Sequence, residues 1–234
     1  KVIRTSLMYS RENPSEEYKE LIVEYKNLHK KGNKQLAGDI MFQGISITFY
    51  LKDLMHLILN VEKPKSILDY GCGKAILYSP TNYNKLLIDK AGSRLKKSLP
   101  ELWNLDYYAL YDPGYEEYNK LPKGKYDGVI CTDVIEHIDE KDCDWILEEI
   151  LSFSKKFVFV SIACYKALKT FTNGKNVHVN VKSPEYWKEK LDALSIKHPH
   201  LNIYSALDVI VTDKKDKMCG KWKTHPYIIK RKEN

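Results

Sequence analysis

Residues 66–73 of this 234-residue chain read Ser-Ile-Leu-Asp-Tyr-Gly-Cys-Gly. A short apolar run that ends in an aspartate and two glycines predicts a buried β-strand followed by a tight turn. In an open parallel sheet, ligands bind outside the carboxyl ends of the strands, where the chain turns toward the next helix. Glycine lets the backbone approach a ligand there, because no Cβ intervenes. The stretch therefore predicts a ligand-binding turn at Asp69, Gly71 and Gly73.

The turn differs from a dinucleotide-binding fingerprint. Residues 71–76 read GCGKAI, whereas that fingerprint requires GxGxxG, with the third glycine for close helix packing. The chain also contains no P-loop motif. A nicotinamide-dependent oxidoreductase is thus disfavoured, although it stays an alternative that calorimetry with a dinucleotide would reveal.

Two further apolar runs end in acidic residues. Residues 107–111 (YYALY) precede Asp112, whose carboxylate is suited to accept hydrogen bonds from both hydroxyls of an adenosine ribose. Residues 126–132 (YDGVICT) lead directly into Asp133, Glu136 and His137. Strands alternate with helices from residue 66 onward, which predicts a mostly parallel sheet with helices on both faces.

The remaining elements follow from periodicity and from helix-capping residues. Residues 15–31 predict an amphipathic helix with Ser15 as N-cap and Gly32 as its end. We also expect helices at 44–60, 133–153 and 184–194, and strands at 157–162, 203–212 and 227–229. Residues 74–105 are hard to interpret because Pro and Asn interrupt them, and residues 214–234 form a basic tail.

Taken together, the motifs ILDYGCG (67–73), YDP (111–113) and YDGVICTDVIEH (126–137) resemble a class I S-adenosylmethionine-dependent methyltransferase over residues 66–163. YDP, CTDVxEH and the later Asn176-Val177-His178 are also similar to uncharacterised methyltransferases carried by bacterial viruses. The resemblance implies an α/β, Rossmann-like fold with a mostly parallel seven-stranded sheet and helices on both faces. We expect an N-terminal helical cap at 1–34 and a cofactor-binding domain at 35–234, with an insert at 76–104.

The resemblance also implies S-adenosylmethionine as cofactor. The carboxylate at Asp69 and the glycine turn would hold its methionine part, Asp112 its ribose, and residues 132–134 the sulfonium side. The residues assigned to the cofactor in this way are Asp69, Tyr70, Gly71, Gly73, Asp112, Pro113, Thr132, Asp133 and Val134. Two departures affect this assignment: Ala75 stands where the family has its third glycine, and the interval before Asp112 is longer than usual.

Four polar residues suggest a metal site. Asp133, Glu136 and His137 share one face if they lie on a helical turn, and His178 follows a later strand. Two carboxylates and two imidazoles suit Mn²⁺, Fe²⁺ or Co²⁺, with Mg²⁺ less favoured. The arrangement is similar to that of small-RNA 3′-end 2′-O-methyltransferases and of a ubiquinone-pathway O-methyltransferase. The alternative is catalysis by His137, His178 and Glu136 through acid–base chemistry without a metal.

The methyl acceptor follows less directly from the sequence. A net charge of +7 favours anions, but only four of the 38 basic residues are Arg, which argues against sequence-specific nucleic-acid recognition. We therefore expect a small metabolite or sugar-like hydroxyl as acceptor, with RNA or a modified nucleotide as the alternative. A non-catalytic cofactor-binding subunit is a further alternative.

The cysteines and the hydropathy bear on localisation. The five cysteines contain no CxxC pair and no long apolar run is present, so we expect a cytoplasmic protein (host cytoplasm if virus-encoded) without membrane contact.

Overall fold

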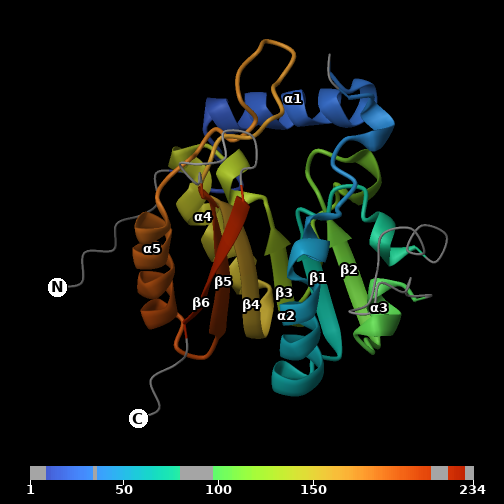
Figure 1. Ribbon diagram of the computed structural model, residues 1–234, viewed down its shortest axis with the longest axis vertical. Helices are drawn as coiled ribbons and strands as arrows, with labels where there is room; N and C mark the ends of the chain where they lie inside the picture. Colours follow the sequence, from blue (N-terminus) through green and yellow to red (C-terminus); the bar gives the residue numbers. More distant parts are fainter. Residues whose placement is uncertain (1–8, 34–35, 80–96, 212–220, 230–234) are drawn as a thin grey trace.

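The computed structural model describes residues 9–33, 36–79, 97–211 and 221–229, and its centre is one six-stranded sheet in the order β2-β1-β3-β4-β5-β6 (Figure 1). Neighbouring strands are parallel except β5 and β6, which are antiparallel. The strands are β1 (Ser66–Tyr70), β2 (Tyr107–Tyr111), β3 (Tyr126–Thr132), β4 (Ser154–Ala163), β5 (Asn202–Val211) and β6 (Lys221–Ile229). The α/β, Rossmann-like fold is confirmed, with six strands among the described residues where the sequence predicted seven.

Helices cover both faces of this sheet because successive residues of each buried strand point to opposite sides. Leu68 and Val129 face α4 (Glu140–Ser152) and α5 (Pro184–Lys197) in one hydrophobic cluster. Ile67 and Ile130 face the other cluster, which α2 (Leu51–His56) and α3 (Leu99–Leu102) help to form. Several 3₁₀ segments complete these layers: Gly38–Ile40, Ser46–Tyr50, Ile76–Tyr78, Glu116–Tyr118 and Ile135–His137. A π-helix, Leu57–Glu62, extends α2.

Helix α1 (Glu16–Lys31) lies across the carboxyl edge of the sheet (Figure 1). As predicted, Ser15 is its N-cap and accepts a hydrogen bond from the backbone of Tyr18, and Gly32 ends it with φ +72°. Ser15 also donates to the buried carboxylate of Asp142 on α4, through its backbone N–H at 3.0 Å and through its hydroxyl. This contact fixes the start of α1 to the main body of the fold.

Two helical predictions need correction. The helix expected at 44–60 begins as a 3₁₀ segment and ends as a π-helix. The helix expected at 133–153 is interrupted: Asp133 has φ +53°, a 3₁₀ turn follows, and α4 starts only after Asp139, whose side chain caps it by accepting from the N–H of Lys141. Asp133, Glu136 and His137 therefore do not lie on one regular helix.

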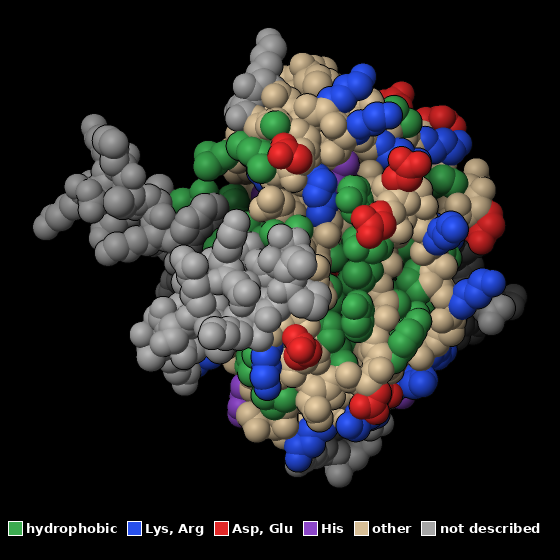
Figure 2. Space-filling view, turned by 90° about the vertical axis from the view of Figure 1, so that its right-hand side faces the viewer, with side chains coloured by type: hydrophobic (Ala, Val, Ile, Leu, Met, Phe, Trp, Pro, Cys, Tyr) green, Lys and Arg blue, Asp and Glu red, His purple; other side chains and the backbone are tan. Residues whose placement is uncertain are grey.

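Other expectations fall partly outside the described residues. Of the insert expected at 76–104, residues 80–96 lie outside them, and most of the basic tail beyond residue 211 does so too. None of the helices within the described ranges has the length and apolar character that crossing a membrane requires. The β2 edge of the sheet exposes Tyr107 and Tyr108, and Figure 2 shows hydrophobic side chains gathered on this side of the molecule.

Candidate active site

A cavity at the carboxyl edge of the sheet brings the predicted residues together. It opens to solvent, and the empty space within it and at its mouth together amounts to about 920 Å³. Every residue that the sequence assigned to the cofactor lines it: Asp69, Tyr70, Gly71, Gly73, Asp112, Pro113, Thr132, Asp133 and Val134. These residues come from the ends of β1, β2 and β3, which are neighbours in the sheet. The shared edge, rather than any contiguous segment, thus creates the cavity.

The glycine turn after β1 is tightly enclosed. Gly71 and Gly73 have φ of +83° and +57°, backbone conformations that residues other than glycine rarely adopt. A Cβ on Gly73 would lie 2.2 Å from the carbonyl oxygen of Phe42, and one on Gly71 would lie 2.2 Å from Val134 Cγ2. The glycines therefore allow the turn to pack against neighbouring segments while its backbone borders the cavity.

Two carboxylates flank this turn, Asp69 buried and Asp112 partly buried. Oδ1 of Asp69 has no hydrogen-bond partner within the described residues. Burial raises the pKa of Asp69 to about 7; the nearby Tyr78 hydroxyl opposes this rise and the charge of Asp112 adds to it. Asp112 accepts from the backbone N–H of Gly73 at 2.9 Å and from that of Gly114 at 2.8 Å. Burial also raises the pKa of Asp112. Since carboxylate oxygens have further lone pairs, both groups keep the capacity to bind a polar ligand.

Helix α1, which lies within the segment expected to form an N-terminal helical cap, is the roof of the cavity; which of its residues line the cavity was not predicted. Its amphipathic spacing identified an apolar face, but spacing alone does not say what that face covers. The lining residues from α1 are Tyr18, Leu21, Ile22, Tyr25 and His29. His29 Nε2 lies 3.9 Å from Asp112 Oδ1, and burial lowers the pKa of this histidine to about 4. At neutral pH His29 is therefore an uncharged neighbour of Asp112.

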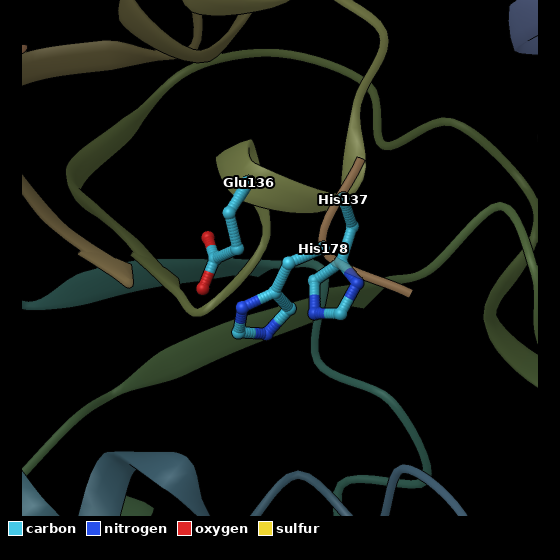
Figure 3. A group of neighbouring side chains, drawn as sticks. All are labelled: Glu136, His137 and His178. Atoms are coloured by element: carbon cyan, nitrogen blue, oxygen red, sulfur yellow. The ribbon is translucent and has the colours of Figure 1, made fainter. Parts of the chain in front are cut away.

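Glu136, His137 and His178 form the group in Figure 3, where the Glu136 carboxylate lies beside the His178 ring and the His137 ring is adjacent. One ligand atom from each lies within 4.8 Å of the others. Glu136 is fully buried, accepts from the N–H of Ala163 through Oε1 at 3.1 Å, and has no partner at Oε2 in the described part of the chain. Burial, and then the charge of Asp133, raise its pKa well above the usual value.

The two histidines are held in the same way. His137 Nδ1 lies 3.0 Å from the carbonyl oxygen of Val177, and His178 Nδ1 lies 2.6 Å from that of Tyr165. Because a carbonyl oxygen only accepts, each neutral ring carries its proton on Nδ1 and keeps a lone pair on Nε2. Burial lowers the pKa of His137 to about 3 and lowers that of His178. Both rings are therefore neutral at pH 7.

Asp133 lies apart from this group, although the sequence placed it among the metal ligands. Its Oδ1 accepts from the hydroxyl of Ser161 at 3.0 Å and lies 3.4 Å from the hydroxyl of Tyr50. Tyr50 in turn donates to Asp208 on β5. The left-handed backbone of Asp133 turns its side chain toward β4 and β5, so three of the four predicted ligands are grouped and the fourth belongs to a neighbouring polar cluster.

Comparison with known proteins gives one match. Residues 45–210, more than two thirds of the chain, match the model of a family described as a methyltransferase domain. No curated protein and no solved structure matches the chain. The matched segment contains all three strand ends that meet at the cavity and also the Glu136, His137 and His178 group. The similarity to methyltransferases of bacterial viruses stays a prediction.

Proposed function

Because the chain belongs to this methyltransferase-domain family, we propose that it transfers the methyl group of S-adenosylmethionine to an oxygen or nitrogen of a small acceptor. The family implies the donor, and the acceptor is our inference. The observation that carries the proposal is the convergence of the turns after β1, β2 and β3 on one cavity beneath α1. A sugar-like hydroxyl or another small metabolite is the favoured acceptor, and RNA is the alternative.

The chain's own residues fit such a donor. The unpartnered Oδ1 of buried Asp69 is an acceptor for the ammonium of the methionine part. The carboxylate oxygens of Asp112 can accept hydrogen bonds from the ribose hydroxyls. Hydrogen bonds to a charged acceptor are stronger than those between two neutral groups. For the adenine ring we assign the apolar end of the cavity between α1 and α4, lined by Leu21, Ile22, Ile138 and Ile146.

Catalysis would require a group that removes a proton from the acceptor. His137 lines the cavity and has Nε2 unprotonated at pH 7, so we assign it as the base, with His178 next to it. The two ring centroids are 4.8 Å apart. Methyl transfer itself is an in-line displacement, for which proximity and alignment supply much of the rate.

A divalent metal is a second candidate for this step, favoured by the unpartnered Oε2 of Glu136. Metal-binding histidines typically donate their other ring N–H to a carbonyl or carboxylate, as both His137 and His178 do. Separations of up to 4.8 Å between the ligand atoms require only a small adjustment around one ion. When bound, Mn²⁺, Fe²⁺ or Co²⁺ would lower the pKa of an acceptor hydroxyl and fix its position.

Calorimetry with S-adenosylhomocysteine, followed by transfer of labelled methyl groups to separated small-molecule and RNA fractions of a cell extract, tests the proposal. We expect binding and labelling of the small-molecule fraction. Labelling of RNA would select the alternative acceptor. Binding without labelling of either fraction would favour a non-catalytic subunit, and absence of binding would refute the proposed function.

A further inference from the structure

The roof helix α1 is connected directly to both histidine segments through one side chain. The hydroxyl of Tyr25 lies 2.9 Å from His137 Nδ1 and donates to the carbonyl oxygen of Val177, also at 2.9 Å. Val177 is the residue immediately before His178. A single phenol on α1 thus contacts the His137 ring and the backbone that leads into His178.

The three polar groups form one consistent hydrogen-bond arrangement. The Val177 carbonyl accepts both from Tyr25 and from the Nδ1–H of His137, and the Tyr25 oxygen provides a second acceptor for that N–H. Moving the proton of His137 to Nε2 would leave the Val177 carbonyl with one donor instead of two. The arrangement therefore favours the tautomer in which Nε2 keeps its lone pair.

The Tyr25 ring is itself held by aromatic contacts on three sides. Its centroid lies 5.2 Å from that of Phe171, 5.5 Å from that of His137 and 5.6 Å from that of Phe42, all with edge-to-face geometry. Phe42 also lines the cavity. These contacts restrict the hydroxyl to one direction, so its position depends on α1 lying over the sheet edge.

We propose that Tyr25 is a positioning residue: when α1 covers the cavity, its hydroxyl holds the His137 ring against the Val177 carbonyl, the acceptor that selects the Nδ1–H tautomer. Enclosure of the cavity and preparation of the histidine then occur together, because the same helix does both. The importance of Tyr25 for catalysis rests on the proposed function, whereas the hydrogen-bond arrangement around Tyr25 does not.

The test is the ¹⁵N chemical shifts of the His137 ring nitrogens at pH 7.5, which report which nitrogen carries the proton. We expect the proton on Nδ1 in the unchanged protein. In Tyr25→Phe we expect a mixture of tautomers, because the His137 ring and the Val177 carbonyl are then no longer held together by the hydroxyl. This variant keeps the ring and its aromatic contacts, so we expect the fold to persist, as thermal unfolding will check. A merely structural role of Tyr25 would change the melting temperature without changing the tautomer.

Tyr18→Phe is the matched control. Tyr18 lies two turns earlier on the same face of α1, lines the same cavity and packs against Trp145 with ring centroids 5.5 Å apart. We expect removal of the Tyr18 hydroxyl to leave the ¹⁵N shifts of His137 unchanged. A proton on Nε2 in the unchanged protein, or identical shifts in Tyr25→Phe, would overturn the proposal. Neither result involves the cofactor, so binding of S-adenosylhomocysteine would decide separately whether the proposed function fails.

Discussion

The carboxylate of Asp112 accepts a hydrogen bond from the backbone N–H of Gly73 at 2.9 Å, and this contact joins the turns that follow β2 and β1. The two turns are separated by 39 residues in the sequence but border the same cavity. A group that both organises the glycine turn and faces the ligand influences binding in two ways. It is therefore the first position at which the proposed cofactor site can be tested.

Asp112→Asn should weaken binding of S-adenosylhomocysteine roughly 10- to 100-fold, because a charged hydrogen bond contributes about 1.5–3 kcal/mol. Asn keeps one carbonyl oxygen for a backbone N–H, so we expect the protein to fold. Calorimetry at pH 7.5 measures the change. Asp127→Asn is the control, since Asp127 lies near the amino end of β3, at the opposite edge of the sheet, and accepts from the N–H of Lys65. Equal affinities of the two variants would remove Asp112 from the binding site.

The pKa of Asp69 predicts that cofactor binding depends on pH. With a pKa of about 7, Asp69 is largely protonated at pH 6, whereas an ammonium ligand requires the carboxylate. Affinity for S-adenosylhomocysteine should therefore fall as pH decreases below 7, by up to about tenfold per unit. The free protein should show the opposite trend: because the folded state holds this proton more tightly than the unfolded state, ionisation lowers the free energy of unfolding as pH rises from 4 through 7.

Calorimetry and thermal unfolding between pH 5.5 and 8.5 would measure both trends. In Asp69→Asn, binding should be weak at every pH, and the part of the stability change that Asp69 causes should disappear. If the unchanged protein bound S-adenosylhomocysteine equally well at pH 5.5 and 8, the assignment of Asp69 to the ammonium would be wrong.

Sequence patterns were reliable where side-chain position follows from regular structure. The ends of β1, β2 and β3 were recognisable as apolar runs that stop at polar residues, and parallel pairing then forces Asp69, Asp112 and Asp133 to one edge. His178 was also located, because the loop after β4 returns to that edge. In these cases the position of each residue follows from the arrangement of the backbone alone.

Contacts that depend on tertiary packing could not be predicted in this way. The spacing of Asp133, Glu136 and His137 indicated a helix, but Asp tolerates the left-handed conformation and a 3₁₀ turn formed instead. Similarly, the apolar face of α1 was visible, but its position over the cavity depends on contacts such as that between Ser15 and Asp142. Nothing in the local sequence specifies a partner more than a hundred residues away.

Gly73→Ala should destabilise the protein far more than Gly124→Ala. Both glycines have positive φ, +57° and +85°, so each substitution carries a backbone cost of about 1–3 kcal/mol. At Gly124 nothing lies within 4 Å of the added Cβ, whereas at Gly73 the carbonyl oxygen of Phe42 would lie 2.2 Å away. Relieving that clash should add about 1–3 kcal/mol. Urea unfolding measures the difference, and equal free energies of unfolding would show that the turn is not tightly enclosed.

If Glu136, His137 and His178 bind a metal, His178→Gln should lower the affinity for Co²⁺ at least tenfold, because one of three protein ligands is lost. The visible absorption of Co²⁺ measures this without any acceptor. Methyl transfer should also disappear on chelation and return with Mn²⁺. His198→Gln is the matched control, because His198 contacts Glu148 at 2.8 Å on another part of the molecule. Absence of Co²⁺ binding by the unchanged protein would leave acid–base catalysis by the histidines.

The contact between Ser15 and Asp142 should determine how firmly α1 covers the cavity. Asp142 accepts from the backbone and hydroxyl of Ser15 and from Trp145 Nε1 at 2.7 Å, so Asp142→Ala leaves three buried donors without their acceptor. We expect a loss of at least about 2 kcal/mol of stability and faster hydrogen exchange throughout α1. Glu17→Ala, which removes only the exposed pair with Lys141, should change neither. Because α1 borders the cavity, added S-adenosylhomocysteine should slow exchange in α1 of the unchanged protein. If exchange in α1 of Asp142→Ala stayed slow, the helix would be held by its apolar face alone.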